Sequence, residues 1–249
     1  MPRAHRHFLP GYAWHITHRC HKQEFLLKFA RDRKYWIHWL YQATRRYGLS
    51  VLNYRVTSNH IHLLVVDTGN DVIPKSMQLI AGRVAQAYNQ RKQRKGAYWE
   101  DRYHATAVET DEHLIRCLIY LDLNMVRAGV VNHPKEWIHS GYYEIHHPPQ
   151  RKGIIDYQRL VEVCGLRDDA SFQELHQHWV ETQLSMGAND REPHWSDAAA
   201  VGNEDFIETI RNQLGYKAKG RRCHRQGQGY QLKEPRVEYA LDFKPKKGD

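Results

Sequence analysis

The sequence has few cysteines and no long apolar run. Its four cysteines lie far apart and form no C-x-x-C pair, which excludes a disulfide framework and a zinc knuckle and indicates reduced thiols. No apolar stretch approaches the roughly 20 residues of a membrane span, and the N-terminus is charged, unlike a signal peptide. We therefore expect a cytoplasmic protein that does not act in a membrane. With 249 residues, 41% of them hydrophobic, it can bury a large core.

Acidic residues are outnumbered, 28 against 37 Lys and Arg, and the imbalance is regional. Residues 1–165 carry a net charge of +10, residues 166–208 of −8 and residues 209–249 of +7. A basic body with a basic end is typical of proteins that bind polyanions. The 15 tyrosines and seven tryptophans offer flat surfaces on which unpaired bases can stack. Charge alone leaves open an ordinary basic protein.

Strand and helix patterns alternate through the first half of the chain. Their order, β-α-β-β-α-β followed by a helix, predicts a ferredoxin-like α+β fold with an antiparallel sheet and helices on one face. We expect Asp32 to cap the first helix and Gly48 to end it. The expected strands are 14–18, 49–56, 60–66 and 104–108, and the expected helices are 32–47, 73–92 and 112–127.

The pattern changes after Pro134, and Pro148-Pro149 marks a junction. Further helices are expected at 155–164 and 171–186, and another from Asn203 to Gly215. Beyond Lys217, Gly, Arg, Lys and Gln dominate, which predicts an extended basic tail with partial order. The expected organisation is a first domain at 1–148, a helical and partly acidic extension at 149–216, and a basic tail at 217–249.

Two histidines stand one residue apart in the expected strand 60–66. Residues i and i+2 of a strand share a face, so His60 and His62 present two imidazoles side by side. Neutral imidazoles held in this way form two corners of a divalent metal site. Because the chain has 18 histidines, a chance pair remains the alternative.

Tyr120 and Asn124 share one face of the expected helix 112–127, because they are four residues apart. A phenol becomes a nucleophile when its deprotonation is assisted and the electrophile is polarised, and Asn124 offers a neutral oxygen to a metal. Asp122 lies off this face. The alternative is a buried tyrosine that packs on the sheet.

Several basic residues are candidates for sequence-independent, salt-sensitive phosphate contacts. The alternative for each is a solvated surface position. His15 and His18, on opposite faces of the first strand, are expected to be structural or solvent-facing. The candidates are Arg83, Arg91, Lys92, Arg94, Arg102, Arg116 and Arg127.

Three segments together resemble the IS200-like tyrosine (Y1) transposases of the HUH superfamily. They are Thr57–Val65, Trp99–Tyr103 and Tyr120–Gly129. The resemblance runs from about Arg3 to Ile155 and is greatest to the relatives associated with repetitive extragenic palindromes (REP). The turn reads Thr-Ser-Asn where relatives often have Met-Pro-Asn, and the C-terminal extension has no counterpart in the short mobile-element enzymes.

The resemblance implies a metal-dependent DNA strand transferase of the bacterial cytoplasm and nucleoid. His60 and His62 would be metal ligands, Asn124 the third ligand, and Tyr120 the nucleophile, with Mg²⁺ or Mn²⁺ as the cation. The implied substrate is single-stranded DNA beside a palindromic hairpin, which is cut and rejoined through a 5′-phosphotyrosine in transposition or recombination. Relatives act as monomers or as homodimers.

Three other functions stay open at this point. A domesticated nickase would process repeats without transposing. A hairpin-binding regulator would keep the fold without cutting, and a metal phosphoesterase would use activated water in place of Tyr120.

Overall fold

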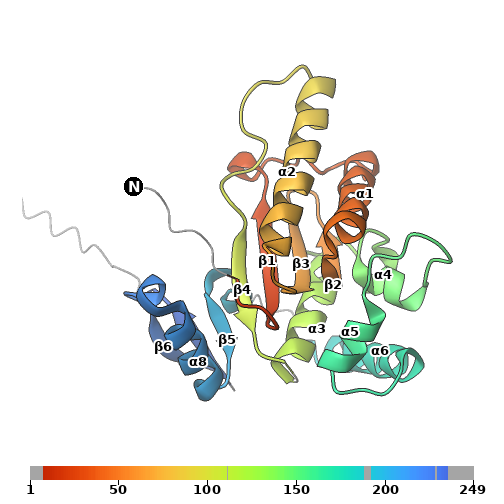
Figure 1. The fold of residues 1–249 in the computed structure, drawn as a ribbon. Helices are drawn as coiled ribbons and strands as arrows, with labels where there is room; N and C mark the ends of the chain where they lie inside the picture. Colours follow the sequence, from red (N-terminus) through yellow and green to blue (C-terminus); the bar gives the residue numbers. More distant parts are fainter. Residues whose placement is uncertain (1–7, 111, 188–191, 228, 235–249) are drawn as a thin grey trace, which may run out of the picture.

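The computed structural model describes residues 8–110, 112–187, 192–227 and 229–234. Within these ranges the chain forms one seven-stranded sheet with helices on both faces (Figure 1). The strand order is β2-β3-β1-β4-β5-β7-β6. The elements of the N-terminal half are β1 (Ala13–Arg19), α1 (Ala30–Tyr47), β2 (Ser50–Val56), β3 (His60–Val66), α2 (Val72–Arg91), β4 (His104–Val108) and α3 (Glu112–Arg127).

The first four strands confirm the ferredoxin-like fold. β1 lies between β3 and β4 and is antiparallel to both, and β2 pairs antiparallel with the other side of β3. In this register His62 lies opposite Thr17 on β1 and opposite Arg55 on β2. The sheet therefore places the start of β3 beside the end of β1.

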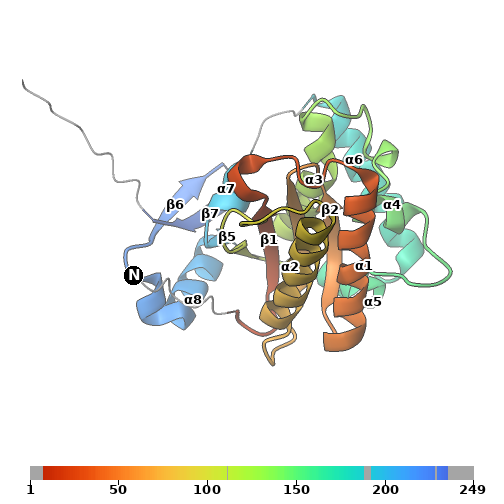
Figure 2. The ribbon, with the colours of Figure 1, turned by 90° about the horizontal axis from the view of Figure 1, so that it is seen from above.

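Helices cover both faces of these strands, whereas the sequence analysis expected them on one. Figure 2 shows α1 and α2 together on one side of the core strands and α3 on the other. The expectation is thus correct for α1 and α2 and wrong for α3. Six of the seven residues of β1 are buried, because layers pack on both of its faces.

The start of α1 also differs from the expectation. The helix begins at Ala30, so Asp32 lies inside its first turn rather than at the cap. The Asp32 carboxylate is buried and lies 2.6 Å from a guanidinium nitrogen of Arg91, which ties α1 to the end of α2. The position of Asp32 is therefore set by an ion pair between two helices and not by capping of the α1 N-terminus. Gly48 ends the helix in the left-handed conformation (φ 70°), as expected.

The C-terminal part is built onto the same sheet. The expected tail is wrong for β6 and β7, which form a hairpin, and β7 pairs with β5 while β5 runs parallel to β4. Leu232 of β7 is fully buried, which explains how a segment rich in Arg and Gln joins the core. The elements are α4 (Gly141–His146), α5 (Tyr157–Val163), α6 (Asp169–Ser185), α7 (His194–Asp197), β5 (Ala200–Gly202), α8 (Glu204–Leu214), β6 (Arg222–Gln226) and β7 (Gly229–Lys233).

Two expectations about the chain as a whole can be compared with the described ranges. No disulfide joins the four cysteines, all of which lie in these ranges. None of the helices that the structure describes is both long and apolar enough to span a membrane. Residues 235–249 of the expected tail lie outside the described part, and the domain boundaries after 148 and 216 stay predictions.

Candidate active site

A pocket of about 370 Å³ lies where the start of β3 faces α3. His60 and His62 point into it from the sheet, with ring centroids 4.9 Å apart. Tyr120 and Asn124 line it from α3, so all four predicted site residues border one cavity. We call this cavity the His–Tyr pocket; its lining also includes Arg19, Arg127 and Ser196.

His60 is oriented by its neighbour Asn59. The His60 Nδ1 atom lies 2.7 Å from Asn59 Oδ1, while the Asn59 amide nitrogen donates to the carbonyl of Gln23 at 3.2 Å. That second bond assigns the amide oxygen to the His60 side, so Nδ1 carries the proton and donates. The lone pair of the neutral His60 ring is then on Nε2.

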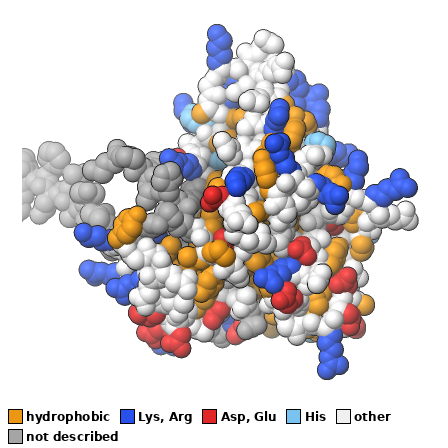
Figure 3. Space-filling view, viewed as in Figure 1, with side chains coloured by type: hydrophobic (Ala, Val, Ile, Leu, Met, Phe, Trp, Pro, Cys, Tyr) orange, Lys and Arg blue, Asp and Glu red, His pale blue; other side chains and the backbone are white. Residues whose placement is uncertain are grey.

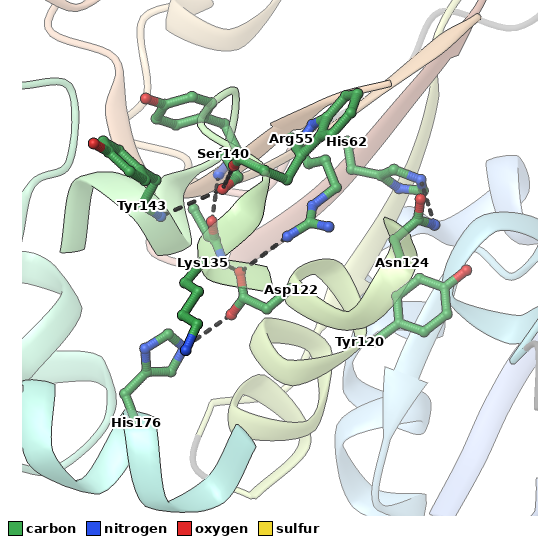
Figure 4. A network of polar contacts seen from close by, with 12 residues as sticks. Arg55, His62, Tyr120, Asp122, Asn124, Lys135, Ser140, Tyr143 and His176 are labelled. Atoms are coloured by element: carbon green, nitrogen blue, oxygen red, sulfur yellow. Dashed lines mark hydrogen bonds and ion pairs between the residues drawn. The ribbon is translucent and has the colours of Figure 1, made fainter. Parts of the chain in front are cut away.

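His62 is buried, with 3% of its surface exposed. Burial lowers its pKa well below the ordinary value, which keeps the ring neutral, as a metal ligand must be. The Asn124 amide nitrogen lies 3.4 Å from His62 Nε2 (Figure 4). A half-turn of this amide would present the Asn124 oxygen at the same place.

Tyr120 lies beside both the imidazoles and a cation. Its ring is 4% exposed, and its centroid lies 6.2 Å from that of His62 in an edge-on arrangement. The Arg127 guanidinium lies over the ring, 4.3 Å from its centroid, and also donates to the Tyr120 carbonyl. Burial lowers the pKa of Arg127. The guanidinium holds the Tyr120 ring through a cation–π contact.

Asp122 belongs to a different network, on the side of α3 away from Tyr120 (Figure 4). Its carboxylate is fully buried, accepts from Asn53 Nδ2 at 3.0 Å and lies 2.8 Å from His176 Nε2. The buried guanidinium of Arg55 lies 3.7 Å away. These contacts fix α3 against β2 and α6, so Asp122 positions the helix that carries Tyr120.

The candidate phosphate-binding residues divide into three groups. Arg127 lines the His–Tyr pocket, and Arg102 lines an adjoining hollow of about 310 Å³ that shares Arg19 and Ser196 with it. Arg116 instead pairs with Glu112 on the surface of α3.

The remaining four lie on α2 and just after it, outside the pocket. Arg83 lies over the Trp39 ring and Lys92 over the Phe29 ring. Arg94 pairs with Glu24 at 3.6 Å, and Arg91 with Asp32. In Figure 3 Lys and Arg surround the α1 and α2 region, while Asp and Glu gather along the lower edge, over the extension.

The sequence analysis did not assign the roles of His15, which contacts His62 from behind the pocket, or of Ser196, which lines it, whereas His18 lies on the opposite face of β1. His15 is fully buried with Nε2 3.0 Å from His62 Nδ1, and His18 is 5% exposed, so the solvent-facing alternative is wrong for both. Ser196 reaches the pocket from α7, in the C-terminal extension. Strand alternation placed His15 and His18 on opposite faces correctly, but it does not reveal what packs on each face.

The donor set fits a divalent cation. Among the described residues no group of three His, Cys, Asp or Glu side chains could hold a metal. The pocket offers two imidazoles and an amide, which leaves coordination positions for phosphate oxygens and water, the ligands that Mg²⁺ and Mn²⁺ favour. A substrate phosphate would complete such a site.

The chain is similar to known transposases. Residues 10–122 match the family model described as IS200-like transposase. A solved REP-associated tyrosine transposase bound to a REP hairpin is similar, with a TM-score of 0.51 and 17% identity over 59% of this chain and 87% of that chain. A crystallised candidate transposase from Deinococcus radiodurans R1 is similar over 51% of this chain and 97% of that chain, with 17% identity and a TM-score of 0.34. No curated protein matches the chain.

Proposed function

We propose that the protein cuts and rejoins single-stranded DNA through Tyr120. The premise is that residues 10–122 match the IS200-like transposase family, as the motifs indicate. One observation carries the proposal. Tyr120 and Asn124 from α3 border the same pocket as His60 and His62 from β3. The matched segment contains Tyr120 and both histidines, whereas Asn124 lies just beyond its end.

His60, His62 and Asn124 are the residues that would hold Mg²⁺ or Mn²⁺. His60 offers Nε2 because Asn59 occupies Nδ1, and Asn124 lies against Nε2 of His62. A bound divalent cation polarises a scissile phosphate and neutralises the charge that develops on it.

Tyr120 supplies the nucleophile of the proposed reaction. Its phenol oxygen loses its proton to solvent and bonds to the phosphorus, while the bond from phosphorus to the 3′ oxygen breaks and that oxygen takes a proton from solvent. The products are a 5′-phosphotyrosine and a free 3′-hydroxyl, and attack by such a hydroxyl reverses the step and rejoins DNA. Arg127, stacked on the Tyr120 ring, positions the nucleophile.

The proposed substrate is single-stranded DNA beside a palindromic hairpin. Support comes from the REP hairpin bound by the structurally similar transposase and from the Lys and Arg side chains around α1 and α2. Arg83, Arg91, Lys92 and Arg94 are proposed to contact the phosphates of the hairpin, whereas Arg102 lies where the cut strand would leave the pocket. The protein would act as a monomer or a homodimer.

Substitution of Tyr120 by Phe tests the chemistry. With Mn²⁺ and a labelled hairpin oligonucleotide, the wild type should give a protein–DNA adduct on a denaturing gel. Tyr120→Phe should lose the adduct and the cleavage but bind the DNA as before. Cleavage that survives in Tyr120→Phe would instead indicate activated water, and a wild type that binds hairpins without cutting them would indicate a regulator.

A further inference from the structure

We propose that His15 is a positioning residue for the metal site, and that it acts through a hydrogen-bond chain from the backbone of the C-terminal extension to His62. The chain runs from the Trp195 carbonyl through the His15 ring to His62. It fixes the tautomer of His62 so that the Nε2 lone pair faces the His–Tyr pocket. The inference rests on the proposed function for the role of His62 as a ligand, but the tautomer itself is independent of that role.

The direction of the chain follows from its fixed end. A carbonyl oxygen only accepts, and the Trp195 carbonyl lies 2.7 Å from His15 Nδ1, so this nitrogen carries the proton. A neutral imidazole has one N–H, so His15 Nε2 must accept. The atom 3.0 Å from it, His62 Nδ1, is therefore the donor. The proton of His62 is thus on Nδ1, and its lone pair is on Nε2, the atom that faces the amide nitrogen of Asn124.

The two rings are held in the neutral form that this chain requires. His15 is fully buried and His62 nearly so, and such burial disfavours a charged imidazolium. The planes of the His15 and His62 rings differ by 8°. Because an imidazole N–H and a ring lone pair both lie in the plane of their ring, the His62 N–H and the His15 lone pair lie in nearly parallel planes. Within the described residues, the Trp195 carbonyl is the one hydrogen-bond partner of His15 Nδ1, and His15 Nε2 is that of His62 Nδ1.

The carbonyl at the start of the chain is itself fixed to the core. The Thr106 hydroxyl, on β4, lies 3.1 Å from the Trp195 carbonyl and 2.7 Å from that of Ala198. His104 Nε2, also on β4, lies 2.8 Å from the Ala198 carbonyl. The Trp195 ring is buried with its centroid 6.2 Å from that of Tyr120. The short helix α7 therefore contacts both His15 and the ring of Tyr120.

The two proposed ligands depend on different parts of the chain. His60 is oriented by Asn59, one residue away in the turn, whereas His62 is oriented by a segment 133 residues later in the sequence. Partners of this kind, which hold a metal-binding histidine through its other nitrogen, typically change metal affinity 10- to 100-fold. The extension is therefore part of the site and not only an appendage.

The test uses the full chain with two substitutions of His15 and one matched control. His15→Phe keeps the volume but removes the acceptor, so the buried Nδ1–H of His62 loses its partner and the proton should move to Nε2. His15→Gln returns an acceptor oxygen near the position of Nε2. His18→Phe is the control, because His18 is also a buried histidine of β1 but lies on the opposite face, stacked on Trp99.

Two measurements report on the chain. Nitrogen-15 NMR of histidine-labelled protein without metal should show His15 and His62 protonated on Nδ1 in the wild type. Titration with Mn²⁺, followed by electron paramagnetic resonance, should show affinity about 10- to 100-fold lower in His15→Phe, mostly recovered in His15→Gln and unchanged in His18→Phe.

Four results would overturn the inference. They are an Nε2–H tautomer of His62 in the wild type, unaltered Mn²⁺ affinity in folded His15→Phe, an equal loss in His18→Phe, and no Mn²⁺ binding by the wild type. Failure of the proposed function would look different, since Tyr120→Phe would then cut DNA while the tautomers and Mn²⁺ affinities stayed as described.

Discussion

The buried carboxylate of Asp122 gives a sharp prediction about stability. Arg55 and Asp122 are both fully buried, and the guanidinium nitrogens of Arg55 have no hydrogen-bond partner among the described residues. Burial lowers the pKa of Arg55 to about 10 even with Asp122 beside it. A fall from 12.5 to about 10 corresponds to about 3 kcal/mol of unfavourable burial that the ion pair does not offset.

Asp122→Leu should therefore lower the free energy of unfolding by about 3–5 kcal/mol, because it leaves a buried charge without its counter-ion. That is a large part of the 5–15 kcal/mol typical of a folded domain. The double substitution Asp122→Leu with Arg55→Met should cost clearly less than the two single costs added together, by at least about 1 kcal/mol. The matched control is Glu112→Gln on the surface of the same helix, which should cost at most about 0.5 kcal/mol.

Urea unfolding followed by circular dichroism measures the wild type and four variants: Asp122→Leu, Arg55→Met, the double substitution and Glu112→Gln. The reasoning is refuted if Asp122→Leu costs less than about 1 kcal/mol, or if the costs at Arg55 and Asp122 simply add. Either result would mean that water or backbone motion solvates the Arg55 guanidinium, and that the network does not hold α3 in place.

Three further predictions concern other parts of the molecule. Burial lowers the pKa of His139 to about 4, so between pH 6.5 and pH 4 the unfolded chain binds a proton that the folded chain does not. The contribution of His139 to the free energy of unfolding should therefore be full above pH 6.5 and be lost as the pH falls towards 4. In acid-unfolding curves His139→Gln should reduce this pH dependence. If β7 belongs to the core, Leu232→Ala should lower the free energy of unfolding, measured in urea, by about 2–5 kcal/mol. If this segment were instead a solvent-exposed tail, the decrease should be under about 1 kcal/mol. Arg102→Ala should weaken DNA binding for all sequences and reduce the salt dependence by about one charge in anisotropy titrations, whereas an unchanged slope would place Arg102 away from the phosphates.

The elements that the sequence predicted best are those whose pattern is strong and local. The strands 60–66 and 104–108 and the helix 112–127 lie at the expected residues, because alternation, helical spacing and a terminal glycine all act within a few residues. The pairing of β1 with β3 and β4 also follows the predicted topology.

The sequence did not predict features that depend on distant contacts. The hairpin of β6 and β7 is short and rich in Arg and Gln, and it is stabilised by pairing with β5, about twenty residues before it. Asp32 is a plausible local cap, but its ion pair with Arg91 decides its position. His15 could be assigned to a face of β1, yet only the fold shows that α7 covers that face.

The convergence of Tyr120 with the histidine pair was foreseeable, because the two motifs were interpreted together. The contribution of the extension was not, since a backbone carbonyl leaves no mark in the sequence. The roles of these residues in catalysis stay predictions until the chemistry is measured.

Mass spectrometry of the trapped complex tests the central claim most directly. The wild type is incubated with Mn²⁺ and a hairpin oligonucleotide that lacks the end needed for rejoining, so that the covalent complex accumulates. The complex is then digested with protease and nuclease, and the peptides are searched for one that carries a nucleotide. The account predicts a 5′-phosphate of the DNA linked to the oxygen of Tyr120. A nucleotide linked to another residue, or cleaved DNA with no linked peptide, would contradict it.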